Sequence, residues 1–347
     1  MPIVPATLEE LLNPEWLTAA LSQRFPDIEV TGVTPGPIVS RVSTNARFTI
    51  ECAGGLPQGL RPALCAKGYF SDEGQRFAHL GEPEAYFYQQ VADVTGARTL
   101  RSVYADVDPE THHGVVITED VIAAGGAFLD ALSPFTPEQA AASLEQLAKL
   151  HGTTWGDSRW SAVSCLASRL PTYLQYRGVD DIQANFDGPV GAGVPPEVRD
   201  AQRLIDAFKV MSGRETSPGA WSVIHGDAHV GNLFLDADGR PGLVDWQLVQ
   251  RGHWAHDVAY HVASALETVD REASEKDLLA HYLDQLRLNG VNAPGWNEAW
   301  TEYRKAIAYG FFLWAITLLV NEKIIAALLQ RLGSAALAHD SFGALGV

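Results

Sequence analysis

The sequence is poor in cysteine, and its few thiols are not arranged as a disulfide framework. Among 347 residues there are three cysteines, Cys52, Cys65 and Cys165, which are odd in number and form no CxxC pair. Disulfides are rare in reducing compartments, where free cysteines serve as small apolar residues. We therefore expect three reduced core residues in a cytoplasmic protein.

Long apolar runs are also missing. No stretch reaches the roughly 18 uninterrupted apolar residues of a membrane span, and no cationic and apolar leader precedes Thr7. The most apolar run, residues 310–320, is too short to span a bilayer and is followed by Glu322 and Lys323. We expect a buried helix there and no membrane partner.

Positive charge is scarce. The chain has 25 Lys and Arg residues against 42 Asp and Glu residues, a formal net charge of -17. Binding a phosphate backbone requires clustered Lys and Arg, so DNA and RNA are not expected partners. The charge suits a cationic or neutral small molecule and also favours solubility. A monomer and a homodimer are equally compatible with it.

The first third of the chain predicts a small α+β lobe, residues 1–119. Short β-branched or alternating segments separated by Gly and Pro are typical of an antiparallel sheet. Apolar residues at helical spacing predict helices. The expected helices are residues 7–25 and 82–94, and the expected strands are residues 28–33, 46–52, 62–70, 99–105 and 114–118.

Residues 120–347 predict a larger, mainly helical lobe. Thr136, Pro137 and Gln139 supply an N-cap, a proline at the first helical position and a capping-box partner, so a helix is expected from there to Trp155. Gly, Pro and polar residues at 171–195 predict a loop or lid. Further helices are expected at 196–211, 256–268, 276–288 and 296–332, the last broken near Asn321.

Polar residues with catalytic potential are concentrated between positions 225 and 247. His225-Gly226-Asp227 follows a short apolar run, Asn232 lies in the same loop, and an Asp-Gly turn separates two apolar runs before Asp245. Phosphoryl transfer needs one group that orients and deprotonates a hydroxyl, and others that hold magnesium against the phosphates. Two carboxylates and an amide at this spacing match that need.

Lys67 lies at the end of an apolar strand, where a cation is unfavourable unless an anion meets it. Glu84, in the next expected helix, could steady the Lys67 ammonium so that it binds nucleotide phosphates, as in kinase sites. Glu82 is a competing partner. The alternative is a surface lysine on an edge strand.

Two weaker signals concern the nucleotide. The loop containing Ser43 and Arg47 lies between strands and could contact phosphate, although it has no GxGxxG pattern and a plain polar hairpin is as compatible. Near Glu119 and Val121, a segment crossing between lobes would leave backbone N–H and C=O groups for an adenine edge. An acidic interdomain turn explains the same residues.

Two residues are expected to support the catalytic loop. His225 can brace the loop through ring hydrogen bonds while Asp227 acts as the base. Asp257 stands where a helix is expected to begin, so a helix-cap role is favoured, with bracing of the catalytic loop as a compatible second role.

These residues resemble the aminoglycoside phosphotransferase and choline kinase superfamily, which has a protein-kinase-like fold. His225, Gly226, Asp227 and Asn232 look like its HGDxxxxN loop, and the Leu-Ala-Lys-Leu-His stretch at 147–151 is similar to its LAxLH helix. The likeness runs from about residue 67 to 259. The Asp-Trp-Gln ending at 245–247 looks closest to the ecdysteroid-kinase-like branch.

The resemblance implies a bilobal α+β protein that moves the γ-phosphoryl group of ATP, or of GTP, to a hydroxyl of a small molecule. It implies that Asp227 is the base and that Asn232 and Asp245 hold Mg²⁺. Lys67 and Glu84 would be the phosphate-binding pair. The first lobe would bind the nucleotide, and the second would carry catalysis and the acceptor.

Two other functions remain compatible with the sequence. Five histidines lie close together near Asp227 and Asp257 and could form the metal site of a hydrolase, namely His225, His229, His253, His256 and His261. A non-catalytic nucleotide-binding module on the same fold is the other alternative, because a fold does not by itself establish turnover.

The acceptor and the number of metal ions stay open. Gln247 stands where many members of the superfamily carry an acidic residue, so one or two ions are compatible with the sequence. Five aromatic residues could wall a pocket for a hydrophobic alcohol or cage a quaternary amine, although aromatics at helical spacing more often pack in a core. They are Trp254, Tyr260, Trp296, Trp300 and Trp314.

Overall fold

A computed structural model describes residues 4–214 and 221–347, which form two compact units. The first unit comprises the chain up to Ala127 together with Leu235–Val249, and the second comprises Phe128–Phe234 and Gln250–Val347. The chain thus passes from the first unit into the second, returns to the first for residues 235–249, and then completes the second. The expected assignment of a nucleotide-binding lobe and a catalytic lobe concerns function and stays a prediction.

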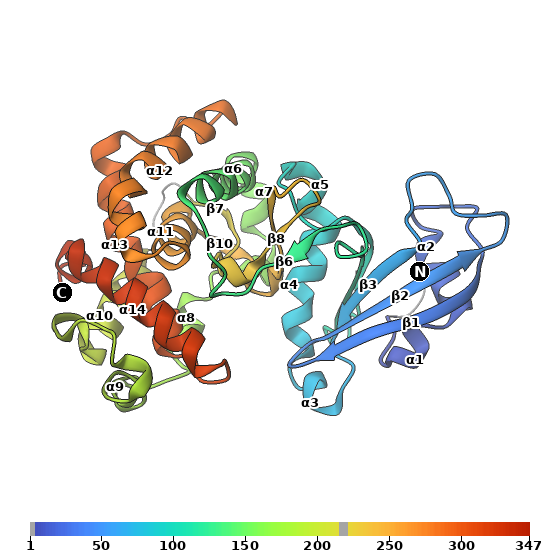
Figure 1. Cartoon of the computed structure of the whole chain (residues 1–347), viewed down its shortest axis with the longest axis horizontal. Helices are drawn as coiled ribbons and strands as arrows, with labels where there is room; N and C mark the ends of the chain where they lie inside the picture. Colours follow the sequence, from blue (N-terminus) through green and yellow to red (C-terminus); the bar gives the residue numbers. More distant parts are fainter. Residues whose placement is uncertain (1–3, 215–220) are drawn as a thin grey trace. The chain divides into compact units, whose positions relative to one another are not determined.

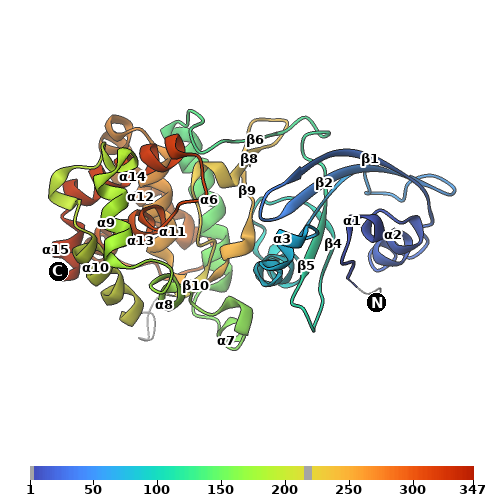
Figure 2. The same cartoon turned by 90° about the horizontal axis from the view of Figure 1, so that it is seen from below.

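The first unit is built on an antiparallel sheet with the strand order β1-β2-β3-β5-β4. Strands β1, β2 and β3 are labelled in Figure 1, and β4 and β5 in Figure 2. Buried and half-buried residues alternate along β3, as expected for a sheet with one face on a core. The five predicted strands are present, with ends shifted by up to three residues except in β1, which was expected to end at Val33 and continues to Ser40. They are β1 (Val30–Ser40), β2 (Thr44–Cys52), β3 (Ala63–Gly68), β4 (Ser102–Val107) and β5 (Gly114–Glu119).

The expected helix at 7–25 is two helices, α1 (Leu8–Leu11) and α2 (Pro14–Leu21). Pro14 has no N–H for a continuous helix, and the Asn13 side chain accepts hydrogen bonds from the N–H groups that begin α2. Both helices contribute leucines to the core cluster of the sheet.

A second helical segment of the first unit begins after α3 (Asp72–Gln75). It runs through α4 (Gly81–Tyr86), a π-helical stretch (Phe87–Val91) and α5 (Ala92–Thr95). This confirms the helix expected at 82–94. The π-helical stretch was not foreseen, and such stretches often occur near functional sites.

The second unit is mainly helical, and α11 (Trp254–Ala265) is buried along its whole length. It contacts α6, α12, α13 and α14, as well as strand β7 (Trp221–Ile224), which pairs antiparallel with β10 (Gln250–His253). The remaining helices are α6 (Pro137–Thr154), α7 (Ser158–Ser161), α8 (Leu170–Tyr173), α9 (Val179–Asp187), α10 (Ala201–Arg214), α12 (Thr268–Leu288), α13 (Trp296–Ala315), α14 (Glu322–Ala338) and α15 (Ser341–Leu345). Short strands β6 (Ala127–Phe128) and β8 (Leu233–Leu235) lie where the chain passes from one unit to the other, and β9 (Pro241–Leu243) belongs to the first unit.

Most of the predictions made from local sequence in this unit are confirmed. The capping box of Thr136 and Gln139 begins α6, and the break near Asn321 is confirmed because Asn321 caps α14. The loop or lid expected at 171–195 is wrong, since the segment includes α8 and α9, where Ile182 and Phe186 are buried one turn apart. Helix α15 was not expected.

The structure also bears on the expectations about the cysteines and about membrane-spanning helices. The three cysteines are free and each is half-buried, so they are not fully inside the core as expected, although Cys52 packs against the core cluster of the sheet. Among the described residues, none of the helices has the length and apolarity needed to cross a membrane.

Candidate active site

The loop after β7 brings Asp227 and Asn232 together in the second unit. Gly226 adopts a φ of 80°, a left-handed conformation that lets the chain turn sharply after His225. A single 3-10 turn, Val230–Asn232, then returns Asn232 to Asp227. The Asn232 amide nitrogen donates to the Asp227 carbonyl oxygen at 2.8 Å and to its Oδ2 at 2.9 Å. This geometry leaves the amide oxygen of Asn232 for another partner.

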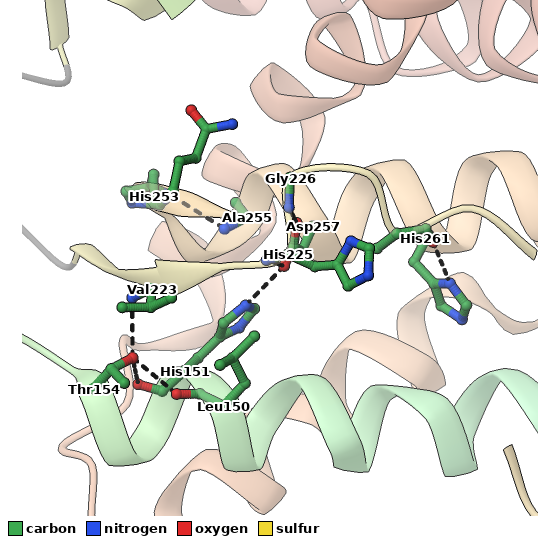
Figure 3. A network of polar contacts seen from close by, with 12 residues as sticks. Leu150, His151, Thr154, Val223, His225, Gly226, His253, Ala255, Asp257 and His261 are labelled. Carbon is green, nitrogen blue, oxygen red and sulfur yellow. Dashed lines mark hydrogen bonds and ion pairs between the residues drawn. The ribbon is translucent and has the colours of Figure 1, made fainter. Parts of the chain in front are cut away.

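The start of this loop is bound to Asp257 of α11 (Figure 3). Asp257 Oδ2 accepts the His225 N–H at 2.6 Å, and its Oδ1 accepts the Gly226 N–H at 2.9 Å. His151 of α6 donates to Asp257 Oδ2 at 3.1 Å and contacts the Tyr282 hydroxyl at 2.8 Å. The loop is therefore fixed to two helices through one buried carboxylate.

The charge of Asp257 is stabilised although the residue is fully buried. Burial alone would raise the pKa of Asp257, but the His151 hydrogen bond and charge and the Gly226 N–H outweigh it, so the pKa lies below its ordinary value. The expected cap role of Asp257 is wrong, because the cap of α11 is His253, whose ring accepts the Ala255 N–H at 3.3 Å. The bracing role is confirmed.

Further contacts hold the rest of the loop after β7. The Asp227 N–H donates to Nδ1 of His225 at 3.2 Å, which confirms His225 as a brace. Tyr309 donates to the Gly226 carbonyl oxygen at 2.7 Å. His261 binds the Ala228 carbonyl oxygen at 2.7 Å through one ring nitrogen and Ser143 at 2.6 Å through the other. Such a rigid shell fixes the direction in which Asp227 points.

The Asp227 carboxylate remains partly accessible, with 19% of its side chain exposed. Its Oδ1 accepts a hydrogen bond from the Tyr260 hydroxyl at 3.0 Å, and that hydroxyl accepts one from Trp314 Nε1 at 2.7 Å. His229 Nε2 lies 3.8 Å from Asp227 Oδ2. One carboxylate oxygen therefore faces Asn232 and the other faces Tyr260.

In the first unit, Lys67 lies between two carboxylates. Its ammonium is 2.6 Å from Glu84 Oε2 and 2.8 Å from Asp245 Oδ1. Burial would lower the pKa of Lys67, but Asp245 and Glu84 outweigh it and raise that pKa well above its usual range. Glu82, the competing partner, pairs instead with His112 at 2.9 Å. The lysine is thus half-buried, charged and paired with Glu84, not a surface residue.

Asp245 has an unusual backbone held by its neighbours. Its φ of 64° is left-handed, which is uncommon for a non-glycine residue and is often found at functional sites. The next residue, Trp246, stacks on Phe87 with ring centroids 3.6 Å apart and donates its indole N–H to Thr99 at 3.0 Å. These contacts fix Asp245 beside Lys67.

The weaker nucleotide candidates have other contacts. Ser43 lies in the tight turn of the β1–β2 hairpin, and the Arg47 guanidinium binds Asp120 at 2.6 Å. Glu119 pairs with Arg101 at 2.8 Å, its N–H donates to the Arg101 carbonyl oxygen, and the Val121 carbonyl oxygen accepts the Gly126 N–H. An adenine contact near these residues would therefore need other backbone groups of the segment.

The five histidines of the alternative metal site do not gather around one point. His225 and His261 bind loop backbone, His253 caps α11, and His256 stacks on Tyr309 with ring centroids 4.8 Å apart. Within residues 4–214 and 221–347 no group of three or more His, Cys, Asp or Glu residues has the geometry to hold a metal ion. The structure gives the hydrolase alternative no support.

The aromatic residues proposed as pocket walls are mostly core. Trp254, Tyr260 and Trp314 are buried, whereas Trp296 is 40% exposed and stacks on Trp300. Only Tyr260 and Trp314 are tied to Asp227 by the hydrogen bonds described above.

Three residues contact the loop or its anchor in a way that was not expected from the sequence, namely His151, Tyr260, which was expected only as a possible pocket wall, and Tyr309. His151 closes the Leu-Ala-Lys-Leu-His stretch, so the motif contained it without a function. Tyr260 follows Asp257 by three positions on one helix, and side chains at that spacing share a face. Helical spacing from Asp257 was therefore a usable signal for Tyr260.

Comparison with known proteins identifies one matching family. A family profile described as "Phosphotransferase enzyme family" matches residues 83–298. No curated protein matches the sequence.

Several solved structures share the fold at low sequence identity. A choline kinase from Cryptosporidium parvum has a TM-score of 0.53 at 12% identity, covering 96% of this chain and 95% of that one. A putative aminoglycoside phosphotransferase from Ralstonia eutropha has a TM-score of 0.52 at 14% identity, covering 94% and 98%. The GDP complex of aminoglycoside 2'-phosphotransferase-IIIa has a TM-score of 0.50 at 15% identity, covering 94% and 99%. The mixed α+β fold is that of kinase-like proteins, and the ecdysteroid-kinase-like branch stays a prediction.

Proposed function

The chain belongs to the phosphotransferase enzyme family, and from this premise we propose that it transfers the γ-phosphoryl group of a nucleoside triphosphate to a hydroxyl of a small molecule. The observation that carries the proposal is the loop after β7. The Asp227 carboxylate in this loop is partly accessible and accepts a hydrogen bond at each oxygen, one of them from the Asn232 amide. The backbone at the start of the loop is bound to the buried Asp257. Such positioning is what a base for a hydroxyl requires.

In this proposal Asp227 accepts the proton of the acceptor hydroxyl as the oxygen attacks the γ-phosphorus. The acceptor oxygen forms the new bond to phosphorus, the bond to the bridging oxygen breaks, and the nucleoside diphosphate leaves with that electron pair. Phosphoryl transfer depends mostly on positioning and electrostatics. The shell of Asp257, His225 and Tyr309 around the loop supports that role.

Lys67 and Glu84 are proposed to bind the nucleotide phosphates. Glu84 is 6% exposed at its side chain and holds the Lys67 ammonium at 2.6 Å, so the lysine presents its charge from a fixed place. A flexible surface lysine would lose more side-chain entropy on binding. Arg47, Ser43 and the backbone near Glu119 and Val121 remain proposed nucleotide contacts.

Asn232 and Asp245 are proposed to hold Mg²⁺. The donor set fits this ion, because magnesium prefers oxygen ligands. The Asn232 amide nitrogen is turned to Asp227, which leaves its oxygen as the ligand atom. Asp245 is 34% exposed at its side chain, and its charge together with Glu84 exceeds that of Lys67 by one. When bound, the ion would neutralise negative charge on the phosphates.

The nucleotide and the acceptor are proposed as classes. ATP is the expected donor and GTP is the alternative, which the GDP complex of the aminoglycoside phosphotransferase supports. The acceptor is a hydroxylated small molecule. Neighbours described as a choline kinase and as an aminoglycoside phosphotransferase support both amine-bearing classes, as does the net charge of -17.

Thermal unfolding tests the proposal. A ligand that binds only the folded state raises the midpoint, by the equivalent of about 2.7 kcal/mol at 100 times its Kd. We expect a Mg²⁺-dependent rise with ATP or GTP in the wild-type protein and no such rise in Asp245→Ala. Asp238→Ala is the matched control, because Asp238 lies in the turn before Asp245 with 70% of its side chain exposed. A wild-type midpoint unmoved by either nucleotide with Mg²⁺ would contradict the proposal.

A further inference from the structure

Tyr260 is placed to control the orientation of the Asp227 carboxylate. It lies on α11, three residues beyond Asp257, and its hydroxyl donates to Asp227 Oδ1 at 3.0 Å. The other carboxylate oxygen accepts the Asn232 amide at 2.9 Å. A carboxylate held through only one oxygen can rotate about its Cβ–Cγ bond, because that torsion is broad. Held at both oxygens, it has one orientation.

The Tyr260 hydroxyl is itself fixed. Trp314 of α13 donates its indole N–H to that hydroxyl at 2.7 Å, so the hydroxyl proton is directed to Asp227. Tyr260 is 1% exposed. Burial first, and then the charge of Asp227, raise the pKa of Tyr260 well above its ordinary value, so the group stays a hydrogen-bond donor.

The ring of Tyr260 packs against Gly310 of α13. A Cβ atom at Gly310 would lie 2.4 Å from the Tyr260 ring, closer than any real contact, so only glycine permits this packing. Tyr309 meets the ring edge to face, with centroids 6.1 Å apart. Gly310 and Trp314 are four positions apart and therefore share one face of α13. Ring and hydroxyl are thus held by a single helix face.

We propose that Tyr260 is the positioning residue of the reaction, which holds the Asp227 carboxylate in the orientation that accepts the acceptor proton, with Trp314 and Gly310 setting Tyr260. The inference rests on the proposed role of Asp227 as the base. A carboxylate oxygen can accept two hydrogen bonds, so Asp227 Oδ1 can bind the Tyr260 hydroxyl and the acceptor hydroxyl together. Tyr260 neither gains nor loses a proton in this role.

A purely structural role makes a different prediction. Tyr303 on α13 provides the comparison, because it is also fully buried and its hydroxyl also donates to a carboxylate, Glu275 Oε2, at 3.2 Å. Glu275 belongs to a separate ion network with Arg271 and His339. Tyr260→Phe and Tyr303→Phe remove equivalent buried hydrogen bonds, yet only the first of them touches Asp227.

The experiment measures Mg²⁺-dependent ATP hydrolysis, with water as the acceptor, in the wild-type protein and in variants. We expect kcat to fall about 10- to 100-fold in Tyr260→Phe, which is part of the roughly 10²–10⁴-fold contribution of general-base catalysis, with KM for ATP unchanged within about twofold. Gly310→Ala, which keeps the hydroxyl but displaces the ring, should also lower kcat. Tyr303→Phe should keep the wild-type kcat.

The outcomes separate this inference from the proposed function. Asp227→Asn is measured beside the tyrosine variants. If Asp227→Asn abolishes hydrolysis while Tyr260→Phe keeps kcat within twofold of Tyr303→Phe, the positioning role is overturned and the base stands. If Asp227→Asn leaves hydrolysis unchanged, or the wild-type protein releases no ADP, the proposed function fails and this inference fails with it. A fall in kcat shared equally by Tyr260→Phe and Tyr303→Phe would also overturn the positioning role.

Discussion

Replacing Asp257 by asparagine removes one acceptor oxygen from the centre of the second unit. Asp257 is fully buried and serves three donors, namely the N–H groups of His225 and Gly226 and the ring of His151. Asparagine has nearly the same size but presents one oxygen and one NH₂ group. If its oxygen takes the place of Oδ2, its nitrogen must face the Gly226 N–H, donor against donor.

The magnitude follows from these contacts. A buried N–H group left without an acceptor costs about 1–3 kcal/mol. The two remaining hydrogen bonds change from a charged to a neutral acceptor, which removes about 1 kcal/mol each. We therefore expect Asp257→Asn to lower the free energy of unfolding by about 3–5 kcal/mol. For a unit of 150–250 residues this lowers Tm by roughly 10 °C.

Calorimetric unfolding measures this change. Asp277→Asn on α12 is the control, because Asp277 is exposed and its replacement should stay within about 0.5 kcal/mol of the wild type. ATP hydrolysis should also fall in Asp257→Asn, since the loop that carries the proposed base Asp227 loses its anchor. A free energy of unfolding within about 1 kcal/mol of the wild-type value would refute the view that Asp257 anchors the loop.

Three further outcomes are expected. Lys67→Met should weaken Mg²⁺-dependent ATP binding at least about tenfold, since the phosphates lose the cation proposed to bind them; calorimetric titration with an unchanged Kd would count against the assignment. Burial lowers the pKa of His256 to about 3 and of His261 to about 4, against 6.5 in the unfolded chain. The unfolded chain therefore binds protons first as the pH falls, and the free energy of unfolding should decrease below pH 6.5 by about 1.4 kcal/mol per pH unit for each histidine; urea denaturation giving equal values at pH 7 and pH 5 would be inconsistent with this. Thr136→Ala should lower stability by about 1 kcal/mol, because the α6 capping box with Gln139 loses its side-chain acceptor, and an unchanged urea midpoint would oppose it.

Features that depend on a few neighbouring residues were predictable from the sequence. The Thr136 capping box, the Asn321 break and the sheet strands follow from side-chain chemistry over a few residues, and the structure has them. The pairing of Lys67 with Glu84 was predictable only as a choice between two acids. Glu84 is buried on the inner face of α4, whereas Glu82 points to His112, and that choice depends on how α4 packs.

The features that the sequence did not predict depend on packing between residues that are far apart in the chain. The segment at 171–195 has the Gly and Pro content of a loop, but Ile182 and Phe186 find a buried environment that makes α9 a helix. Asp257 looked like a helix cap because sequence shows the start of α11 only approximately, and its partners lie more than thirty residues away. Tyr260 depends on Gly310 of another helix, which no local pattern connects to it.

Nucleotide binding and turnover measured together on Asp227→Asn test the central claim most directly. Asp227 is proposed to accept the acceptor proton and not to bind the nucleotide. We predict that calorimetry will give a Kd for ATP with Mg²⁺ within about threefold of the wild-type value, while ADP formation falls at least about 100-fold. Wild-type ADP formation in Asp227→Asn, with ATP bound normally, would contradict the account.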